Sequence, residues 1–118
     1  MAEPVDEFFE ELRREYLAEA AVRLAELRMD LAALRAGDPG AAQALKGRVH
    51  RLAGSGGSYG FPLVSQVSRE TEALIASNPT PDAAVLDSLD QAVVRLADAF
   101  DAAAESVGLP KVNPDRFA

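Results

Sequence analysis

Apolar residues recur every three or four positions in four segments of this 118-residue chain, which is the spacing of a buried stripe on an α-helix. The first segment covers about residues 5–36, and its main stripe runs from Leu17 to Leu34. A second stripe that starts at Phe8 has a different phase, so we expect the helix to bend or break near Arg14. No segment alternates with period two, and no β-strand is therefore expected.

Proline, glycine and helix-capping residues separate the four segments. The predicted boundaries are Gly37 after the first segment, Asp38-Pro39 and Gly60 around the second, Phe61-Pro62 and Asn78-Pro79 around the third, and Thr80-Pro81-Asp82 and Gly108 around the fourth. Four amphipathic helices with short connections predict an all-α fold, an antiparallel up-down four-helix bundle, with a short extra N-terminal helix if the first segment breaks. We expect one domain over residues 1–118, with the bundle at about 5–108 and a tail at 109–118.

Composition excludes several classes of protein. The chain has no cysteine and one histidine, which rules out disulfides, thiol nucleophiles and multi-histidine metal sites. Its formal net charge of −7 argues against nucleic acid and anionic membranes as partners. The acidic N-terminus does not resemble a signal peptide, and no apolar run reaches the roughly 18 residues of a membrane span. We therefore expect a cytoplasmic protein that has no cofactor or metal of its own.

The charges are distributed unevenly, and the only histidine lies in a window without acids. Residues 39–69 contain no Asp or Glu and four bases, which are Lys46, Arg48, Arg51 and Arg69. His50 lies inside this window. An anion is tolerated there more easily than elsewhere in the chain, because no carboxylate in the local sequence repels it.

The second segment is predicted to expose His50 on an open surface. On a helical wheel His50 lies about 140° from the centre of the apolar stripe, so it should face solvent. Its neighbours on that face have almost no side chain, apart from one cation: they are Gly47, Ala53, Gly54, Gly57 and Lys46. Helical glycines at 47, 54, 56 and 57 together cost roughly 3–4 kcal/mol relative to alanine, and such a cost is typical of a functional surface. We interpret the bare face as access for the active site of another protein.

The chemistry predicted for this face is phosphoryl transfer. A histidine of ordinary pKa, about 6.5, is largely neutral at pH 7, so a ring nitrogen is available as a nucleophile. A phosphoryl group adds about two negative charges, which Lys46 would offset with help from Arg51 or Arg69. Gln66 and Arg69 are expected on the exposed side of the next helix, as docking residues. No magnesium site is expected beside His50, so the partner would supply the metal and its acidic pocket.

The run His50-Arg51-Leu52-Ala53-Gly54-Ser55, followed by Gly60 and by Thr71-Glu72, resembles the histidine-containing phosphotransfer (HPt) domain. The family pattern is His-x-Leu-Lys-Gly-Ser, a glycine about ten residues after the histidine, and a Leu-Glu pair on the next helix. Two positions depart from it: Ala53 stands where the family has a phosphate-neutralising lysine, and Thr71 replaces the leucine.

The resemblance implies a phosphocarrier of two-component phosphorelays. His50 would exchange a phosphoryl group with an aspartate of receiver domains, in a hybrid histidine kinase, a response regulator or both. Such a carrier is not an enzyme with turnover of its own, because the receiver supplies magnesium and most catalytic groups. Nothing exposed in the apolar stripes demands a dimer, so we expect a monomer.

Three alternatives stay open at this point. Residues 54–60 are rich in glycine and could form a phosphate-binding loop, although the Gly-Lys-Ser/Thr of a P-loop and a preceding strand are missing. A bundle of the same shape could bind receiver domains without transfer, an idea to which Ala53 gives weight. A kinase dimerisation bundle would carry an acid directly after the histidine, where this chain has Arg51.

Overall fold

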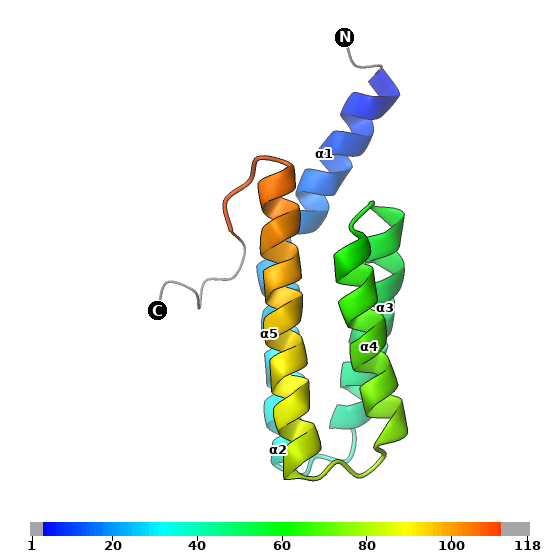
Figure 1. Ribbon diagram of the computed structural model, residues 1–118, viewed down its shortest axis with the longest axis vertical. Helices are drawn as coiled ribbons and strands as arrows, with labels where there is room; N and C mark the ends of the chain where they lie inside the picture. The colour runs from blue at the N-terminus through cyan, green and yellow to red at the C-terminus, as the bar shows by residue number, and fades with distance from the viewer. Residues whose placement is uncertain (1–3, 112–118) are drawn as a thin grey trace.

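The computed structural model describes residues 4–111, and all regular structure in that range is helical. The five helices are α1 (Pro4–Ala18), α2 (Ala20–Arg35), α3 (Ala41–Ser58), α4 (Pro62–Ser77) and α5 (Ala83–Ser106). Helices α2 to α5 run up and down as an antiparallel bundle, and α1 extends past one end of it (Figure 1). The predicted all-α four-helix bundle with an extra N-terminal helix is confirmed. No helix in the described range is long and apolar enough to cross a membrane.

The first segment does break, but not at the predicted residue. The break lies at Glu19, whose backbone N–H donates to Tyr16 O at 3.3 Å, and the expected position near Arg14 is wrong. The reason is that the last turn of α1 already belongs to the core: Leu17 is fully buried, and the ring of Tyr16 stacks on Tyr59 with centroids 4.6 Å apart. The chain therefore changes direction only after these contacts are made.

Helix α3 begins at Ala41, three residues later than Asp38, where the sequence analysis placed its cap. The preceding Gly37 has a positive φ of 83° and ends α2, which glycine allows at low cost. The Asp38 carboxylate accepts a hydrogen bond from the backbone N–H of Gly40 at 2.9 Å. Asp38 thus stabilises the turn before the helix, and Gly40 occupies the capping position.

Helix α5 begins at Ala83, two residues later than expected with Thr80 as the cap and Asp82 in the first turn; Asp82 is itself the capping residue. The Asp82 carboxylate accepts a hydrogen bond from the backbone N–H of Val85 at 2.9 Å, which satisfies one of the unpaired donors at the helix start. Asp82→Ala should therefore lower the free energy of unfolding by about 1 kcal/mol, measured by urea denaturation. Asp82→Asn keeps a capping acceptor and should lose much less; equal losses in both variants would contradict the capping role.

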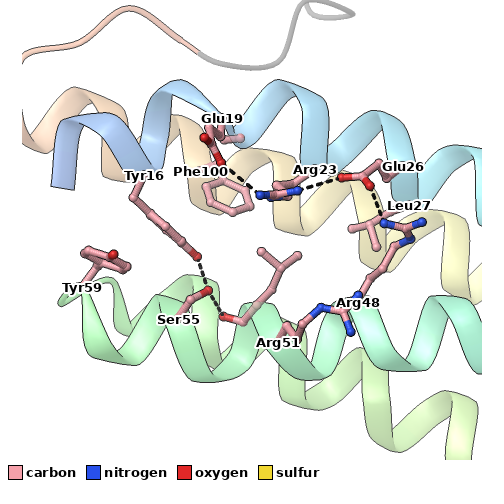
Figure 2. A pocket seen from close by; sticks show the side chains of 12 residues that line it. Tyr16, Glu19, Arg23, Glu26, Leu27, Arg48, Arg51, Ser55, Tyr59 and Phe100 are labelled. Carbon is pink, nitrogen blue, oxygen red and sulfur yellow. Dashed lines mark hydrogen bonds and ion pairs between the residues drawn. The ribbon is translucent and has the colours of Figure 1, made fainter. Parts of the chain in front are cut away.

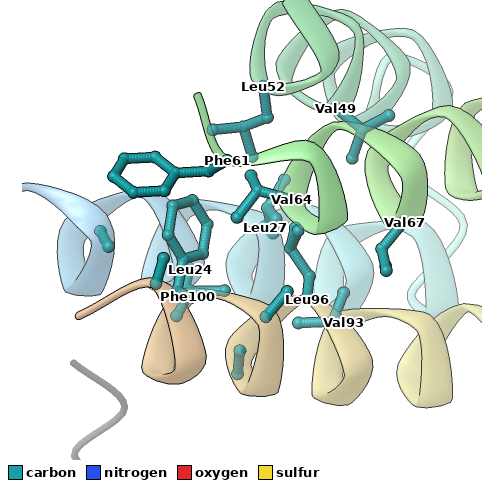
Figure 3. Close-up of a cluster of buried hydrophobic side chains, with 14 of the residues drawn as sticks. Leu24, Leu27, Val49, Leu52, Phe61, Val64, Val67, Val93, Leu96 and Phe100 are labelled. Carbon is teal, nitrogen blue, oxygen red and sulfur yellow. The ribbon is translucent and has the colours of Figure 1, made fainter. Parts of the chain in front are cut away.

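The core fills the space between α2, α3, α4 and α5 (Figure 3). Each helix contributes the stripe that the sequence predicts, and the central side chains include Leu24, Leu27, Val49, Leu52, Val64, Val67, Val93, Leu96 and Phe100. Leu109 packs against the same cluster, so the start of the predicted tail lies on the bundle. The remainder of that tail, residues 112–118, lies outside the described residues.

The helical conformation of α3 also excludes one of the three alternatives, the phosphate-binding loop. Residues 54–58 lie within this helix, and no strand precedes them in the part of the chain that the structure describes. A phosphate-binding loop between a strand and a helix is therefore absent from this glycine-rich segment.

Candidate functional site

His50 projects from the outer face of α3 into solvent, with 72% of its side chain exposed. One ring nitrogen is engaged: Nδ1 lies 2.7 Å from Oε2 of Glu72 on α4. An ionised carboxylate only accepts hydrogen bonds, so Nδ1 carries the hydrogen and donates it to Glu72. In the neutral ring, Nε2 then holds the free lone pair, and it has no hydrogen-bond partner among the described residues.

Glu72 places a carboxylate beside the histidine, although the local sequence around His50 contains none. The acid-free window ends at residue 69, but α4 folds back antiparallel to α3 and brings Glu72 level with His50. Sequence reasoning did not place Glu72 in the site. The available signal was the Thr71-Glu72 pair, whose glutamate the resemblance already matched.

Close packing of α3 against α4 fixes the position of this pair. Ser65 Oγ on α4 donates to Ala53 O on α3 at 2.6 Å. A Cβ on Gly56 would lie 2.9 Å from Ser65 N and 2.9 Å from Val64 Cγ1, closer than real Cβ atoms come. Gly56 is therefore needed for α3 and α4 to approach this closely. The expectation that it belongs to the glycines of the functional surface is wrong.

The other helical glycines meet no such restriction. A Cβ on Gly54 would have no neighbour within 4 Å, and on Gly57 its nearest contact would be Ser65 Oγ at 3.6 Å. A Cβ on Gly47 would lie 3.5 Å from Arg51 Nη1. Packing thus does not demand glycine at these positions. Gly54 and Gly57 are exposed and leave the surface beside His50 open, whereas Gly47 is half-buried next to the Arg51 guanidinium.

Ala53 does not belong to that open face. Its exposure is 6%, because it lies on the side of α3 that packs against α4. The expectation that Ala53 offers a docking surface is wrong. Its small side chain instead lies beneath the outer face, at the seam between the two helices.

The predicted cations lie on two sides of His50. Lys46 is half-buried one turn earlier on α3, and Arg69 is exposed on α4. Neither has a hydrogen bond or ion pair in the described part of the chain. Gln66 is also exposed on α4, and its amide donates to Glu70 at 3.3 Å. These two α4 residues therefore lie where the sequence analysis expected docking residues.

Arg51 lies about 100° around α3 from His50, on the side away from α4, where it lines a pocket of about 370 Å³ between α2 and α3 (Figure 2). Arginine and glutamate side chains on the pocket rim neutralise one another: Arg23 bonds Glu19 at 3.0 Å and Glu26 at 3.2 Å, and Arg48 also pairs with Glu26. The rim thus presents little unpaired charge, with the guanidinium of Arg51 as its cation without a partner among the described residues.

Tyr16 and Ser55 line the same pocket and are joined by a hydrogen bond between α1 and α3. Tyr16 Oη and Ser55 Oγ are 2.7 Å apart, and burial raises the pKa of the Tyr16 phenol above its ordinary value. The hydroxyl therefore stays protonated at neutral pH and ties α1 to α3. On the same helix, the Arg13 guanidinium donates to Tyr59 O at 2.9 Å. These bonds attach α1 to the end of α3 that follows His50.

No group of three or more His, Cys, Asp or Glu side chains that could hold a metal ion occurs in the described residues. Within residues 4–111 the site consists of an exposed imidazole, one orienting carboxylate, an open backbone surface and cations without a hydrogen-bond or ion-pair partner.

A comparison with protein families identifies this arrangement. The family model described as Hpt domain matches residues 11–106. The chain belongs to the Hpt domain family. No curated protein and no solved structure matched the chain in the corresponding searches.

Membership has direct consequences for function. An Hpt domain is a phosphotransfer module of two-component signalling, and such domains are phosphocarriers rather than catalysts. The family also implies interaction with receiver domains of phosphorelay proteins. The matched range includes α2 to α5 and the last turns of α1, so it contains every residue of the site described above.

The role of Glu72 in this Hpt domain is testable through the ring tautomer. Glu72→Ala should raise the population of the neutral ring that carries hydrogen on Nε2, because nothing then holds the hydrogen on Nδ1. Since that tautomer lacks a lone pair on Nε2, phosphoryl transfer should slow about tenfold. Nitrogen-15 NMR of the imidazole and single-turnover transfer rates measure the two effects.

Glu72→Gln is the matched control, because its amide oxygen can still accept from Nδ1. It should keep most of the tautomer preference while it loses the negative charge. A wild-type ring with hydrogen mainly on Nε2 would contradict the positioning role of Glu72.

Proposed function

We propose that this Hpt domain carries a phosphoryl group on Nε2 of His50 and exchanges it with an aspartate of receiver domains, in hybrid kinases, response regulators or both. The observation that supports this assignment is the hydrogen bond between Nδ1 and Glu72, which leaves Nε2 as the free and solvent-facing nitrogen. The partner nucleophile is an aspartate because receiver domains carry their phosphoryl group on that residue type.

The transfer step balances without an added acid or base. The Nε2 lone pair attacks phosphorus, the N–P bond forms, and the bond from phosphorus to the aspartyl oxygen breaks, so the aspartate leaves as a carboxylate. The ring becomes positively charged as it attacks while it still holds the hydrogen on Nδ1. Glu72 stabilises that charge through the hydrogen bond, and the reverse transfer uses the same contact.

The open glycine surface gives the receiver room to place its active site against the imidazole. In this proposal the receiver brings magnesium and the acidic residues that bind it, and the Hpt domain brings the nucleophile and positive charge. Lys46 lies on the His50 side of α3 and reduces the repulsion between the incoming phosphoryl group and Glu72. Arg51, on the pocket side, makes a smaller contribution. We expect the domain to act as a monomer in the cytoplasm.

One observation favours a second function. The family's lysine is replaced by Ala53, so a bundle that binds receivers without accepting phosphate is the alternative. The two functions differ in covalent labelling, because both predict receiver binding and only the first predicts a phosphorylated histidine.

Transfer profiling with phosphorylated receivers tests the proposal. Each receiver of the source organism is phosphorylated, mixed with the Hpt domain and sampled over seconds to minutes. Rapid appearance of an acid-labile label on the Hpt domain, from one or two receivers, would support phosphotransfer and name its partners. Binding of those receivers without any label would leave the docking module as the function.

A further inference from the structure

The packing of α3 against α4 gives the register between the two helices. His50 lies level with Glu72, through their 2.7 Å hydrogen bond, and Gly56 lies level with Val64 and Ser65, through the close approach of their backbones. Because the helices are antiparallel, residues between these two points follow in opposite order. Ala53 therefore lies level with residues 68–69 of α4.

Arg69 is the exposed member of that pair of residues. Ser68 is fully buried, whereas Arg69 lies about 60° from Glu72 on the outer side of α4. It is also one helical turn before Glu72, about 4.5 Å along the helix axis. An extended arginine side chain is long enough to cover this distance, so the guanidinium can reach the surface on which Nε2 of His50 is exposed.

Arg69 is also available to bind an anion. The two glutamates near it on α4 have other partners: Glu72 accepts from His50, and Glu70 pairs with Arg95 at 2.6 Å and accepts from Gln66. The Arg95 contact lowers the pKa of the Glu70 carboxyl, which keeps this pair ionised at neutral pH. No hydrogen bond or ion pair holds the Arg69 side chain within residues 4–111.

We infer that Arg69 binds the phosphoryl group carried by His50 and replaces, from α4, the cation that Ala53 lacks on α3. The inference rests on the proposed function and adds to it the residue that compensates for the missing lysine. Because Ala53 is small and Arg69 lies level with it, the positive charge occupies nearly the same place but comes from the neighbouring helix. A guanidinium offers several N–H donors to phosphate oxygens, which suits this role.

Lys46 and Arg51 are less suited to the same role. Lys46 lies on the opposite axial side of His50, level with the last turn of α4, and is half-buried. The guanidinium of Arg51 lies beside Gly47 and lines the α2–α3 pocket. Of the three cations, Arg69 is thus the one that lies on the same axial side of His50 as Ala53.

The equilibrium constant of phosphoryl exchange separates phosphate binding from docking. That constant depends only on the free energies of the separate proteins, each with and without its phosphoryl group. A residue that acts only in the complex therefore changes the forward and reverse transfer rates by the same factor and leaves the constant unchanged. The Hpt domain is phosphorylated with phosphoramidate, a small donor that needs no receiver, and is then mixed with the receiver until the phosphate distribution is constant.

Arg69→Gln should shift this distribution about fivefold toward the receiver, because one cation near a doubly charged group is lost. Arg69→Lys should restore most of the wild-type value. Arg14→Gln removes the same charge from an exposed position on α1 and should leave the constant unchanged. An equilibrium constant that is the same in Arg69→Gln and wild type, or that shifts only in Lys46→Gln, would overturn the inference.

A second measurement separates this inference from the proposed function. If the loaded wild type passes phosphate to no receiver, the proposed function fails. Phosphorus-31 NMR of the loaded proteins then still tests Arg69, since a bound guanidinium lowers the second pKa of the phosphoryl group in wild type and not in Arg69→Gln. Identical titrations in the two proteins would contradict the contact.

Discussion

His50→Gln should abolish phosphoryl transfer, with a loss of at least about 1,000-fold, because it removes the nucleophile itself. The chain has one histidine, so no second imidazole can accept the group. The variant should remain folded, since 72% of the His50 side chain is exposed and the glutamine amide can still donate to Glu72. Single-turnover labelling from the cognate phosphorylated receiver measures the loss, and helical circular dichroism with urea denaturation checks the fold.

The same variant separates transfer from docking. It should bind the unphosphorylated receiver with an affinity within a few-fold of wild type, because the open surface around residue 50 is unchanged. Labelling of His50→Gln at the wild-type rate would show that another residue type accepts phosphate. That result would remove His50 from the mechanism, whatever the binding data show.

Alanine at two neighbouring glycines of α3 should change stability in opposite directions. Gly56→Ala should lower the free energy of unfolding by about 2 kcal/mol, because the new methyl group lies 2.9 Å from the backbone of Ser65 and forces α3 and α4 apart. Gly54→Ala should raise it by about 1 kcal/mol, since its methyl group meets nothing within 4 Å and alanine favours the helix. Urea denaturation of the two variants measures both effects.

The more stable variant should be the poorer phosphotransfer protein. A methyl group on Gly54 projects into the open face one turn after His50, where the receiver backbone approaches, and should slow transfer about fivefold. Transfer by Gly54→Ala at the wild-type rate would contradict the access role of this surface. A gain in stability for Gly56→Ala would contradict the structural role of the second glycine.

The helices could be predicted because their signals are local. Apolar spacing, Pro62 at the start of α4, and the glycine after α2 each act within a turn of the residues they order. The break between α1 and α2 was misplaced because it depends on Tyr16 and Leu17, which are held by residues distant in the chain. Periodicity within one segment contains no information about such contacts.

The features of the site likewise divide into those set by local sequence and those set by contacts between helices. The exposure of His50 and the bare face follow from a helical wheel of one segment, so sequence reasoning reached them. The Nδ1 contact to Glu72, the burial of Ala53 and the close approach at Gly56 depend on the register between α3 and α4. That register is set by interhelical packing, which the stripes of the two helices do not specify.

The residues proposed to carry out the transfer lie between Lys46 and Glu72, on the single hairpin formed by α3 and α4. Nucleophile, orienting carboxylate and cations are thus encoded in one contiguous stretch of about a quarter of the chain. The outer faces of α2 and α5 carry none of them, so we expect substitutions on those faces to leave the proposed reaction intact. Related carriers in one cell can therefore differ on these outer faces, and so in the partners that they exclude. The reactive hairpin of α3 and α4 stays the same.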